Sequence, residues 1–348
     1  MSVHTFGFGT TSDGRAAHLY VLDNANGMRV GVTDLGACLA SLHVPDKDGG
    51  LPDVVLGFDS ATGYEHNPCD LGAVVGRNAN RISAGHFTLD GQDYQLELND
   101  GANNLHSGPD MWFERLWDAA TDDGNNSVTF HLSSPDGDQG FPGAVEAYVT
   151  YQLTEGNVLS VDYDARPDRR TVLNLTNHAY FNLNGHDSGK IDDHLLWIDA
   201  DEYTASTADL ITTGDIMGVA GTAMDFREPR RIGEGFGSTD ALIDVIGGYD
   251  HNYLLNGSGL RPVARLEGNR SGIVMEVRTD RPAIQLYVSN ALDEPRGKDG
   301  FAYGTHEGVC LETQYIPDAI NKPEWEQPVH DAEHPFVSRT EFAFSVRE

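Results

Sequence analysis

Five short polar segments carry the side chains of this sequence that are best suited to chemistry. They occupy residues 76–81, 103–108, 176–183, 249–253 and 308–319. In each segment, ionisable or amide side chains stand close to apolar or aromatic ones. A sugar cleft needs this mixture, because hydroxyl groups require hydrogen bonds while the sugar ring presents flat apolar faces. The segments therefore indicate a sugar site.

Glu312 is the first candidate for proton transfer. It follows the apolar run at residues 309–311, a setting that could desolvate the carboxylate and raise its basicity. A surface glutamate that stands beside a strand by chance would show the same pattern. Both interpretations are open from the residues alone.

His178, Tyr180 and Asn182 alternate along the segment that follows the apolar residues 171–176. If a strand at 171–176 continues through them, all three side chains project onto one face, because neighbours in a strand point to opposite faces. The alternative is an edge strand that shows its polar face to water.

Three further positions, Arg81, His106 and Asp250, could either bind the sugar or have a structural role. Arg81, beside Asn80, could donate a forked pair of hydrogen bonds to sugar oxygens or hold its loop by salt bridges. His106 could bind the sugar or be a structural loop histidine. Asp250 could hold sugar hydroxyls or simply form a turn.

Strand signals dominate the elements that must position these groups. Residues 127–134 (SVTFHLSS) alternate apolar and polar side chains with the period of a half-buried strand, and 86–98 predict a hairpin that turns at Asp90-Gly91. Helical periodicity is sparse. Further strands are expected at 158–164, 171–176, 273–279 and 283–289.

Many short strands separated by Gly, Asn and Asp turns predict an all-β fold, a large antiparallel β-sandwich built as one domain over residues 1–348. Residues 187–239 are the most irregular stretch. They keep aromatic and aliphatic anchors, so we expect long ordered loops there.

The charge of the chain excludes several classes of partner. Lys and Arg number 23 against 54 Asp and Glu, for a formal net charge of −31, which repels nucleic acids and anionic membranes. No apolar stretch is long enough for a membrane span, and the N-terminal sequence lacks the pattern of a signal peptide. Three widely spaced cysteines fit a reducing compartment. We therefore expect a cytoplasmic protein with a neutral small-molecule substrate.

No motif for a metal or a cofactor stands out. His330 and His334 have the spacing of a helical metal pair, but Pro328 and Pro335 flank them and no HExxH motif is present. A nucleotide-binding loop and a serine-hydrolase elbow are also missing from the sequence. The sequence predicts neither a bound metal nor a cofactor.

Taken in order, the polar segments resemble the aldose 1-epimerase (galactose mutarotase) family. The resemblance is carried by GRNANRI, NNLHSG, TNHAYFNL, YDHNYLL and GVCLETQYIPDAIN, with LDG after the first and FERLW after the second, and it covers nearly the whole chain. It implies the galactose-mutarotase-like β-supersandwich, an open sugar cleft, and the interconversion of the α and β anomers of free hexoses such as galactose and glucose.

The resemblance also implies roles for particular residues. The general acid falls on His178 and the general base on Glu312. The sugar-binding positions fall on Asn80, Arg81, His106, Asp250 and Gln285, with Tyr180 beside them. Alanine stands at position 179, where the family often has a small polar residue, which bears on fine sugar preference.

One acid–base pair suffices for this reaction, because ring opening and closure each need one proton taken and one given. Two other functions fit the same fold: a hexose-phosphate epimerase, which would need a basic pocket, and a noncatalytic sugar-binding module. The sequence leaves open the preferred aldose and the choice between a monomer and a homodimer.

Overall fold

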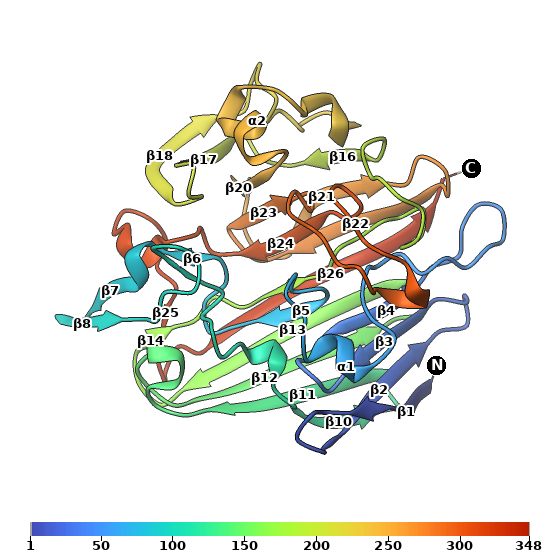
Figure 1. Cartoon of the computed structure of the whole chain (residues 1–348), viewed down its shortest axis with the longest axis horizontal. Helices are drawn as coiled ribbons and strands as arrows, with labels where there is room; N and C mark the ends of the chain where they lie inside the picture. The colour runs from blue at the N-terminus through green and yellow to red at the C-terminus, as the bar shows by residue number, and fades with distance from the viewer. Residues whose placement is uncertain (1, 348) are drawn as a thin grey trace.

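The computed structural model describes residues 2–347, and its regular elements are almost all strands (Figure 1). The α-helices of this part of the chain are single turns, α1 (Ala61–Tyr64) and α2 (Ile243–Ile246). Short 3-10 turns lie at Ser83–Gly85, Trp112–Glu114, Asp138–Gly140, Ile232–Gly235, Asp240–Leu242, Lys298–Gly300 and Ala319–Asn321. Within residues 2–347, none of these helices has the length and apolar content needed to cross a membrane.

The largest sheet has nine antiparallel strands and joins distant parts of the chain. In spatial order they are β10 (Asp118–Asp122), β11 (Ser127–Ser134), β12 (Val145–Leu153), β13 (Val158–Pro167), β26 (Phe336–Val346), β22 (Ile273–Thr279), β21 (Arg261–Glu267), β16 (Leu195–Ile198) and β19 (Arg230–Arg231). Burial alternates along β12, so that its apolar face lies in the core while its other face is partly exposed. The strands predicted at 127–134 and 273–279 have the bounds expected from their periodicity.

A second sheet of five strands carries three of the eight predicted site residues, Asp250, Gln285 and Glu312. Its order is β18 (Thr212–Gly218), β17 (Glu202–Ser206), β20 (Asp250–Leu254), β23 (Ala283–Tyr287) and β24 (Cys310–Gln314). In Figure 1 its outer strands β17 and β18 lie at the top with α2, and β26 of the large sheet crosses below β24. Every residue of β24 is buried, so this strand is covered on both faces.

The remaining strands form a four-stranded sheet and four short pairs. The sheet is β1 (Ser2–Thr10), β2 (Ala16–Asp23), β3 (Arg29–Thr33) and β4 (Leu39–His43). The pairs are β14 (Thr171–Val172) with β25 (Val329–His330), β15 (Thr176–His178) with β5 (Ala73–Val75), β6 (Arg81–Ile82) with β9 (Asn104–Leu105), and β7 (His86–Leu89) with β8 (Gln92–Gln95).

The predicted hairpin is confirmed in strands β7 and β8. Asp90 and Gly91 connect them with φ of 53° and 77°. A two-residue hairpin turn of this kind needs positive φ at both positions, which aspartate and glycine tolerate better than other residues.

The prediction of long loops over residues 187–239 was wrong. Four strands, β16 to β19, lie in this stretch, and β16 and β17 pair with β21 and β20 much later in the chain. Most of β18 (TTGDIMG) is exposed, and its apolar and polar residues do not alternate. Local periodicity misses such strands, because the ladder partner that stabilises them is distant in sequence.

The strand expected at 171–176 is interrupted, and it does not continue as one strand through 182. The strand stops after Val172 and resumes as β15, because the backbone N–H groups of Leu173 and Asn174 bind carbonyls of other loops. The Asn182 side chain donates to the carbonyls of Gly189 and Glu307, which removes it from the face shared by His178 and Tyr180.

Candidate active site

The five-stranded sheet presents a row of polar side chains across three adjacent strands. Gln285 of β23 stands opposite Asn252 of β20 and opposite Glu312 of β24. Directly opposed residues of an antiparallel pair point to the same face, as do residues two apart on one strand. Tyr287 and Asp250 therefore share this face with Glu312.

Glu312 is buried, with a side chain that is only 3% exposed. Its Oε2 atom has no hydrogen-bond partner within residues 2–347. Burial raises the pKa of this carboxyl well above its usual value, and the carboxylates of Asp250 and Asp70 raise it further, against a smaller opposing effect of Arg81. The structure thus excludes a surface glutamate at this position.

His178 reaches Glu312 from strand β15, which lies alongside β24. Its Nε2 atom lies 3.6 Å from Glu312 Oε1, and its Nδ1 atom lies 3.5 Å from the Sγ of Cys310. Burial raises the pKa of the Cys310 thiol well above its usual value, so the sulfur stays uncharged and can accept weakly from Nδ1. A ring proton on Nδ1 leaves the lone pair of Nε2 facing Glu312.

Burial favours the uncharged forms of both groups. It lowers the pKa of His178 to about 4 and raises that of Glu312 well above its usual value, which favours a neutral imidazole beside a carboxyl that keeps its proton. Moving that proton from Glu312 to His178 gives a carboxylate and an imidazolium without exchange with solvent. The pair can therefore serve as base and acid in one turnover.

Asn80, Arg81 and His106 come from two loops that β6 and β9 hold together. Asn80 and His106 have left-handed backbones, with φ of 62° and 53°, and the backbone N–H of Asn80 donates to His106 Nδ1 over 3.1 Å. Because Nδ1 accepts, the neutral ring carries its proton on Nε2. Burial lowers the pKa of His106 well below its usual value, and His178 and Arg81 add to the effect.

Arg81 is held by an ion pair and also lines the pocket. Its Nε donates to Asp100 over 2.7 Å, which anchors the side chain. Its two terminal nitrogens make no hydrogen bond to any residue in 2–347, and the side chain lines the pocket.

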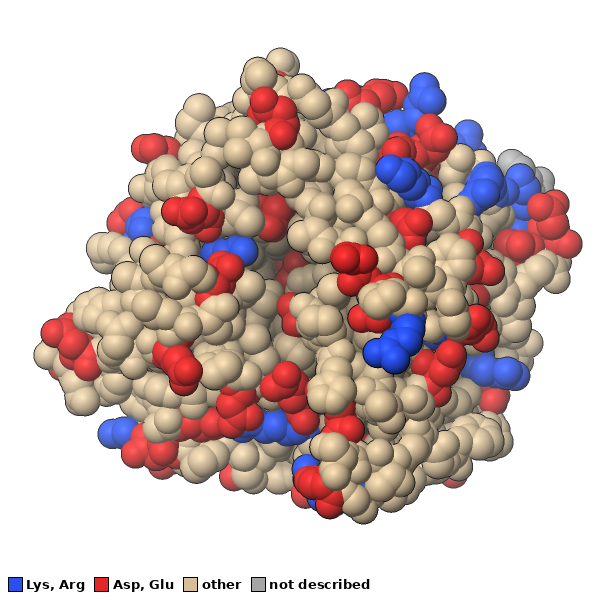
Figure 2. Space-filling model, in the orientation of Figure 1, with Lys and Arg blue, Asp and Glu red and all other residues tan. Residues whose placement is uncertain are grey.

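These groups surround a pocket of about 270 Å³. Figure 2 shows a hollow near the centre of this face, with acidic side chains in it and around it. Seven of the eight predicted site residues line the pocket: Asn80, Arg81, His106, His178, Tyr180, Asp250 and Glu312. Gln285 does not line it.

Gln285 instead lies behind Asp250. Its Nε2 donates to Asp250 Oδ1 over 2.6 Å, and its Oε1 is buried without a partner in the described chain. Tyr180 is similarly occupied at one end, because its hydroxyl donates to the carbonyl of Cys69 while its ring lies 5.1 Å from that of His178. The predicted set is thus one spatial cluster, with Gln285 in a supporting position.

Sequence reasoning missed several residues that line the same pocket. Tyr287 had a usable signal, because it stands two positions after Gln285 on one strand and so shares its face. Asp70 had none, since an aspartate before an apolar strand is typical of a turn. The other missed residues are Pro68, Cys69, Leu105, Leu210, Ile246, Asn290, Ala291 and Leu292.

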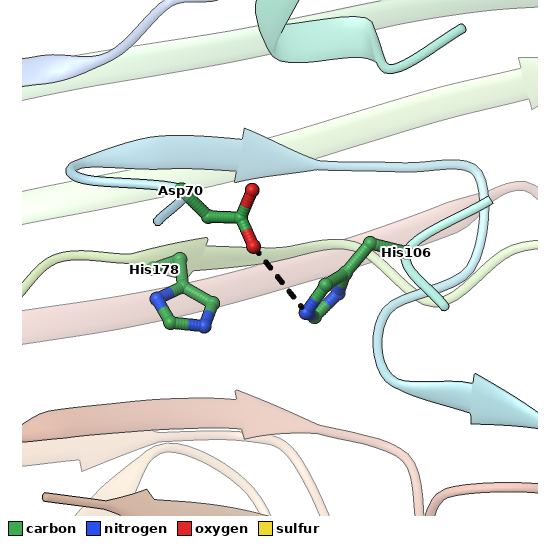
Figure 3. Close-up of side chains that lie close together, drawn as sticks. All are labelled: Asp70, His106 and His178. Carbon is green, nitrogen blue, oxygen red and sulfur yellow. Dashed lines mark ion pairs between the residues drawn. The ribbon is translucent and has the colours of Figure 1, made fainter. Parts of the chain in front are cut away.

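Asp70, His106 and His178 could in principle hold a metal ion (Figure 3). Their potential ligand atoms lie within 4.8 Å of one another. A metal needs a free lone pair on each imidazole, however, and the tautomer of His106 places a proton on the Nε2 atom that faces Asp70. The arrangement fits a hydrogen-bond donor at His106 better than a metal ligand.

Comparison with known proteins gives a consistent family assignment. The family model for aldose 1-epimerase matches residues 18–343. A galactose mutarotase of Bos taurus is 42% identical over 321 residues, which cover 92% of this chain and 92% of the relative. The chain belongs to the aldose 1-epimerase family. An aldose 1-epimerase of Escherichia coli (strain K12) is 38% identical over 318 residues, 91% of each chain.

Solved structures of aldose epimerases share the fold. An aldose epimerase homologue from C. elegans superposes with a TM-score of 0.89 at 30% identity, covering 96% of this chain and 100% of that one. A galactose 1-epimerase from Lactobacillus acidophilus has a TM-score of 0.88 at 28% identity, with both chains covered completely. The all-β sandwich expected from the sequence is confirmed. The activity is aldose anomer interconversion, an isomerase reaction.

Proposed function

We propose that this chain interconverts the α and β anomers of free hexoses such as galactose and glucose, with Glu312 as general base and His178 as general acid. The observation that carries the proposal is the unpartnered Oε2 of buried Glu312, in a pair whose Nε2 and Oε1 atoms are 3.6 Å apart. Oε2 is one of several buried polar atoms without a partner in the described chain, and it belongs to a side chain that lines the pocket, where a ligand or water can complete it. A sugar hydroxyl is a suitable donor to this oxygen.

The reaction opens and closes the sugar ring. The carboxylate of Glu312 takes the proton of the anomeric hydroxyl, the bond between C1 and the ring oxygen breaks, and the imidazolium of His178 protonates that oxygen. Rotation about the C1–C2 bond presents the other face of the new carbonyl. Closure returns both protons by the reverse transfers, so the protein ends as it began.

Substrate binding selects the charged form of the pair. The carboxylate and imidazolium state has the same number of protons as the neutral state, so no proton has to enter from solvent. Sugar hydroxyls that donate to Glu312 favour its ionised form, because hydrogen bonds to a carboxylate lower its pKa. Binding would thereby create the base when the substrate is present to use it.

The neighbouring polar groups hold the sugar in position. We assign hydrogen bonds with its hydroxyls to Asn80, Arg81, His106 and Asp250, and the aromatic ring of Tyr180 to one apolar face. Gln285 holds the Asp250 carboxylate. Positioned proton transfer accelerates a reaction by about 10² to 10⁴-fold, so the remaining acceleration comes from the orientation of the sugar by these hydrogen bonds.

The charges of the pocket favour a free sugar over a sugar phosphate. Three carboxyl groups, Asp70, Asp250 and Glu312, line the pocket, and the guanidinium of Arg81 is already paired with Asp100. A phosphate group would need cations that are not already neutralised. This counts against the hexose-phosphate alternative.

We also infer that residues 1–348 act as one cytoplasmic domain. The pocket draws residues from position 68 to position 312, so it is not contained in either half of the chain alone. Cys38, Cys69 and Cys310 are free thiols, which suits a reducing compartment.

The test is polarimetry of freshly dissolved α-galactose and α-glucose. The wild-type protein should speed the approach to anomeric equilibrium, and Glu312→Gln and His178→Asn should lose that activity while staying folded. If the wild type binds sugar in calorimetry but matches the buffer blank in polarimetry, the chain is a binding module and the proposal fails.

A further inference from the structure

Asp70 is a pocket carboxylate that the proposed mechanism leaves unused. It lies just before β5 with a left-handed backbone, φ 58°. Its side chain accepts no hydrogen bond from any residue in 2–347, although only 19% of it is exposed. Figure 3 shows the carboxylate directed toward the ring of His106, beside His178.

The gap between Asp70 and His106 has a donor on one side and an acceptor on the other. His106 Nε2 and Asp70 Oδ2 are 3.9 Å apart, too far for a direct hydrogen bond. Because the Asn80 N–H occupies His106 Nδ1, the proton of the neutral ring sits on Nε2 and faces the carboxylate. One atom that both accepts and donates would complete the contact.

A sugar hydroxyl has this dual capacity. An oxygen about 2.8 Å from each of the two atoms spans 3.9 Å with a bent geometry, accepting from His106 and donating to Asp70. A methyl ether or a hydrogen at the same position could not donate. The anomeric hydroxyl is not the candidate, since the proposed function assigns it to Glu312.

We propose that Asp70 is a specificity-determining residue that binds, together with His106, one non-anomeric hydroxyl of the substrate. The proposal rests on the proposed function, because it assumes a free aldose in this pocket. Asp70 thus selects sugars that carry a hydroxyl at one ring position, through a hydrogen bond to its carboxyl group.

The experiment crosses protein variants with substrate variants. Anomeric exchange is followed by NMR for wild type and Asp70→Ala on galactose and on its 2-, 3-, 4- and 6-deoxy forms. Loss of a hydrogen bond to this carboxyl predicts a fall of about 5- to 100-fold in kcat/KM for Asp70→Ala on galactose. On the one analogue that lacks the bridged hydroxyl, wild type and variant should agree within about twofold, because the partner is already gone.

Two further variants guard the result. Asp70→Asn keeps the side-chain volume if Asp70→Ala does not fold. Asp293→Ala removes an exposed carboxylate close to Cys69 on the pocket rim, and it should leave every rate unchanged.

The outcomes separate this inference from the proposed function. Asp70→Ala at wild-type rates on galactose, or equal losses on all five sugars, overturns the role of Asp70 while the epimerase activity stands. A wild type that accelerates anomeric exchange of no sugar overturns the proposed function itself.

Discussion

Two buried pairs each join a basic and an acidic side chain: Lys298 with Asp53, and His178 with Glu312. They differ in how many of their polar atoms have hydrogen-bond partners. Lys298 Nζ lies 2.6 Å from Asp53 Oδ2, 3.0 Å from the Ala40 carbonyl and 2.5 Å from the Val55 carbonyl. Asp53 Oδ1 accepts from two backbone N–H groups. Each donor of the ammonium has an acceptor.

The His178–Glu312 pair has no such completion. Its two facing atoms are 3.6 Å apart, and Oε2 of Glu312 has no partner in the described part of the chain. Burial alone therefore does not distinguish an active site from a structural ion pair. The distinguishing property is an incomplete set of hydrogen bonds that a substrate can complete.

The sharpest test of this contrast is Glu312→Gln. We expect kcat/KM for anomeric exchange to fall about 10² to 10⁴-fold, because the general base is gone. The control variant Glu324→Gln makes the same substitution at an exposed glutamate, and it should keep the wild-type rate. Wild-type activity in Glu312→Gln would remove the basis of the contrast.

The same variant should gain stability at neutral pH. The pKa of Glu312 is raised on folding, so between its ordinary value of 4.5 and the raised value the unfolded chain binds fewer protons than the folded one. Wild-type stability from this group is therefore lost as pH rises through that window, whereas glutamine does not titrate. Thermal unfolding should show a larger advantage of Glu312→Gln at pH 7 than at pH 4.

Lys298→Met should lower stability and leave activity unchanged, which is the reverse of the effects expected for Glu312→Gln. It leaves Asp53 buried without its cation, so we expect a loss of about 3 to 5 kcal/mol in the free energy of unfolding and an unchanged rate per folded molecule. The double variant Lys298→Met with Asp53→Leu should recover much of that stability, as measured by denaturant unfolding. A single variant as stable as wild type would contradict the structural role.

The acid limb of the activity profile tests the shared proton. Burial lowers the pKa of His178 to about 4, so the imidazole is protonated by solvent only near that pH. Both His178 and Glu312 then carry a proton, and neither can act as the base. We expect kcat/KM to fall about tenfold per pH unit below pH 4. The pH profile is measured in the Asp70→Asn variant, because burial raises the pKa of Asp70 to about 7 and its titration would otherwise overlap the profile. An acid limb near the ordinary histidine pKa would contradict the neutral pair.

Arg81→Lys should have the smallest effect. The ammonium can keep a charge near Asp100 but cannot anchor through Nε while pointing two nitrogens at the sugar. We expect a fall of about 3- to 10-fold in kcat/KM, mainly through KM, in steady-state kinetics on galactose. A loss as large as that of Glu312→Gln would show that Arg81 acts in the chemistry.

The alternation of apolar and polar residues predicted strands correctly where one face of the strand is exposed to solvent and the other is buried. Strand β11 and the hairpin at Asp90-Gly91 follow directly from alternation and from turn chemistry. It failed at β18, whose residues do not alternate between apolar and polar, and at residues 173–175, where contacts with other loops interrupt the ladder. In both places the deciding hydrogen bonds join distant segments.

The sequence by itself determined the all-β character, the acidic charge that disfavours anionic partners, and the residue types that later meet in the pocket. Only the tertiary structure decided which of them meet. It brings His178 to Glu312 across 134 positions of chain, sets Gln285 behind Asp250, and adds Asp70. The physical reason is that proton affinity and hydrogen-bond satisfaction depend on burial and on distances of a few ångström, which no short segment of sequence specifies.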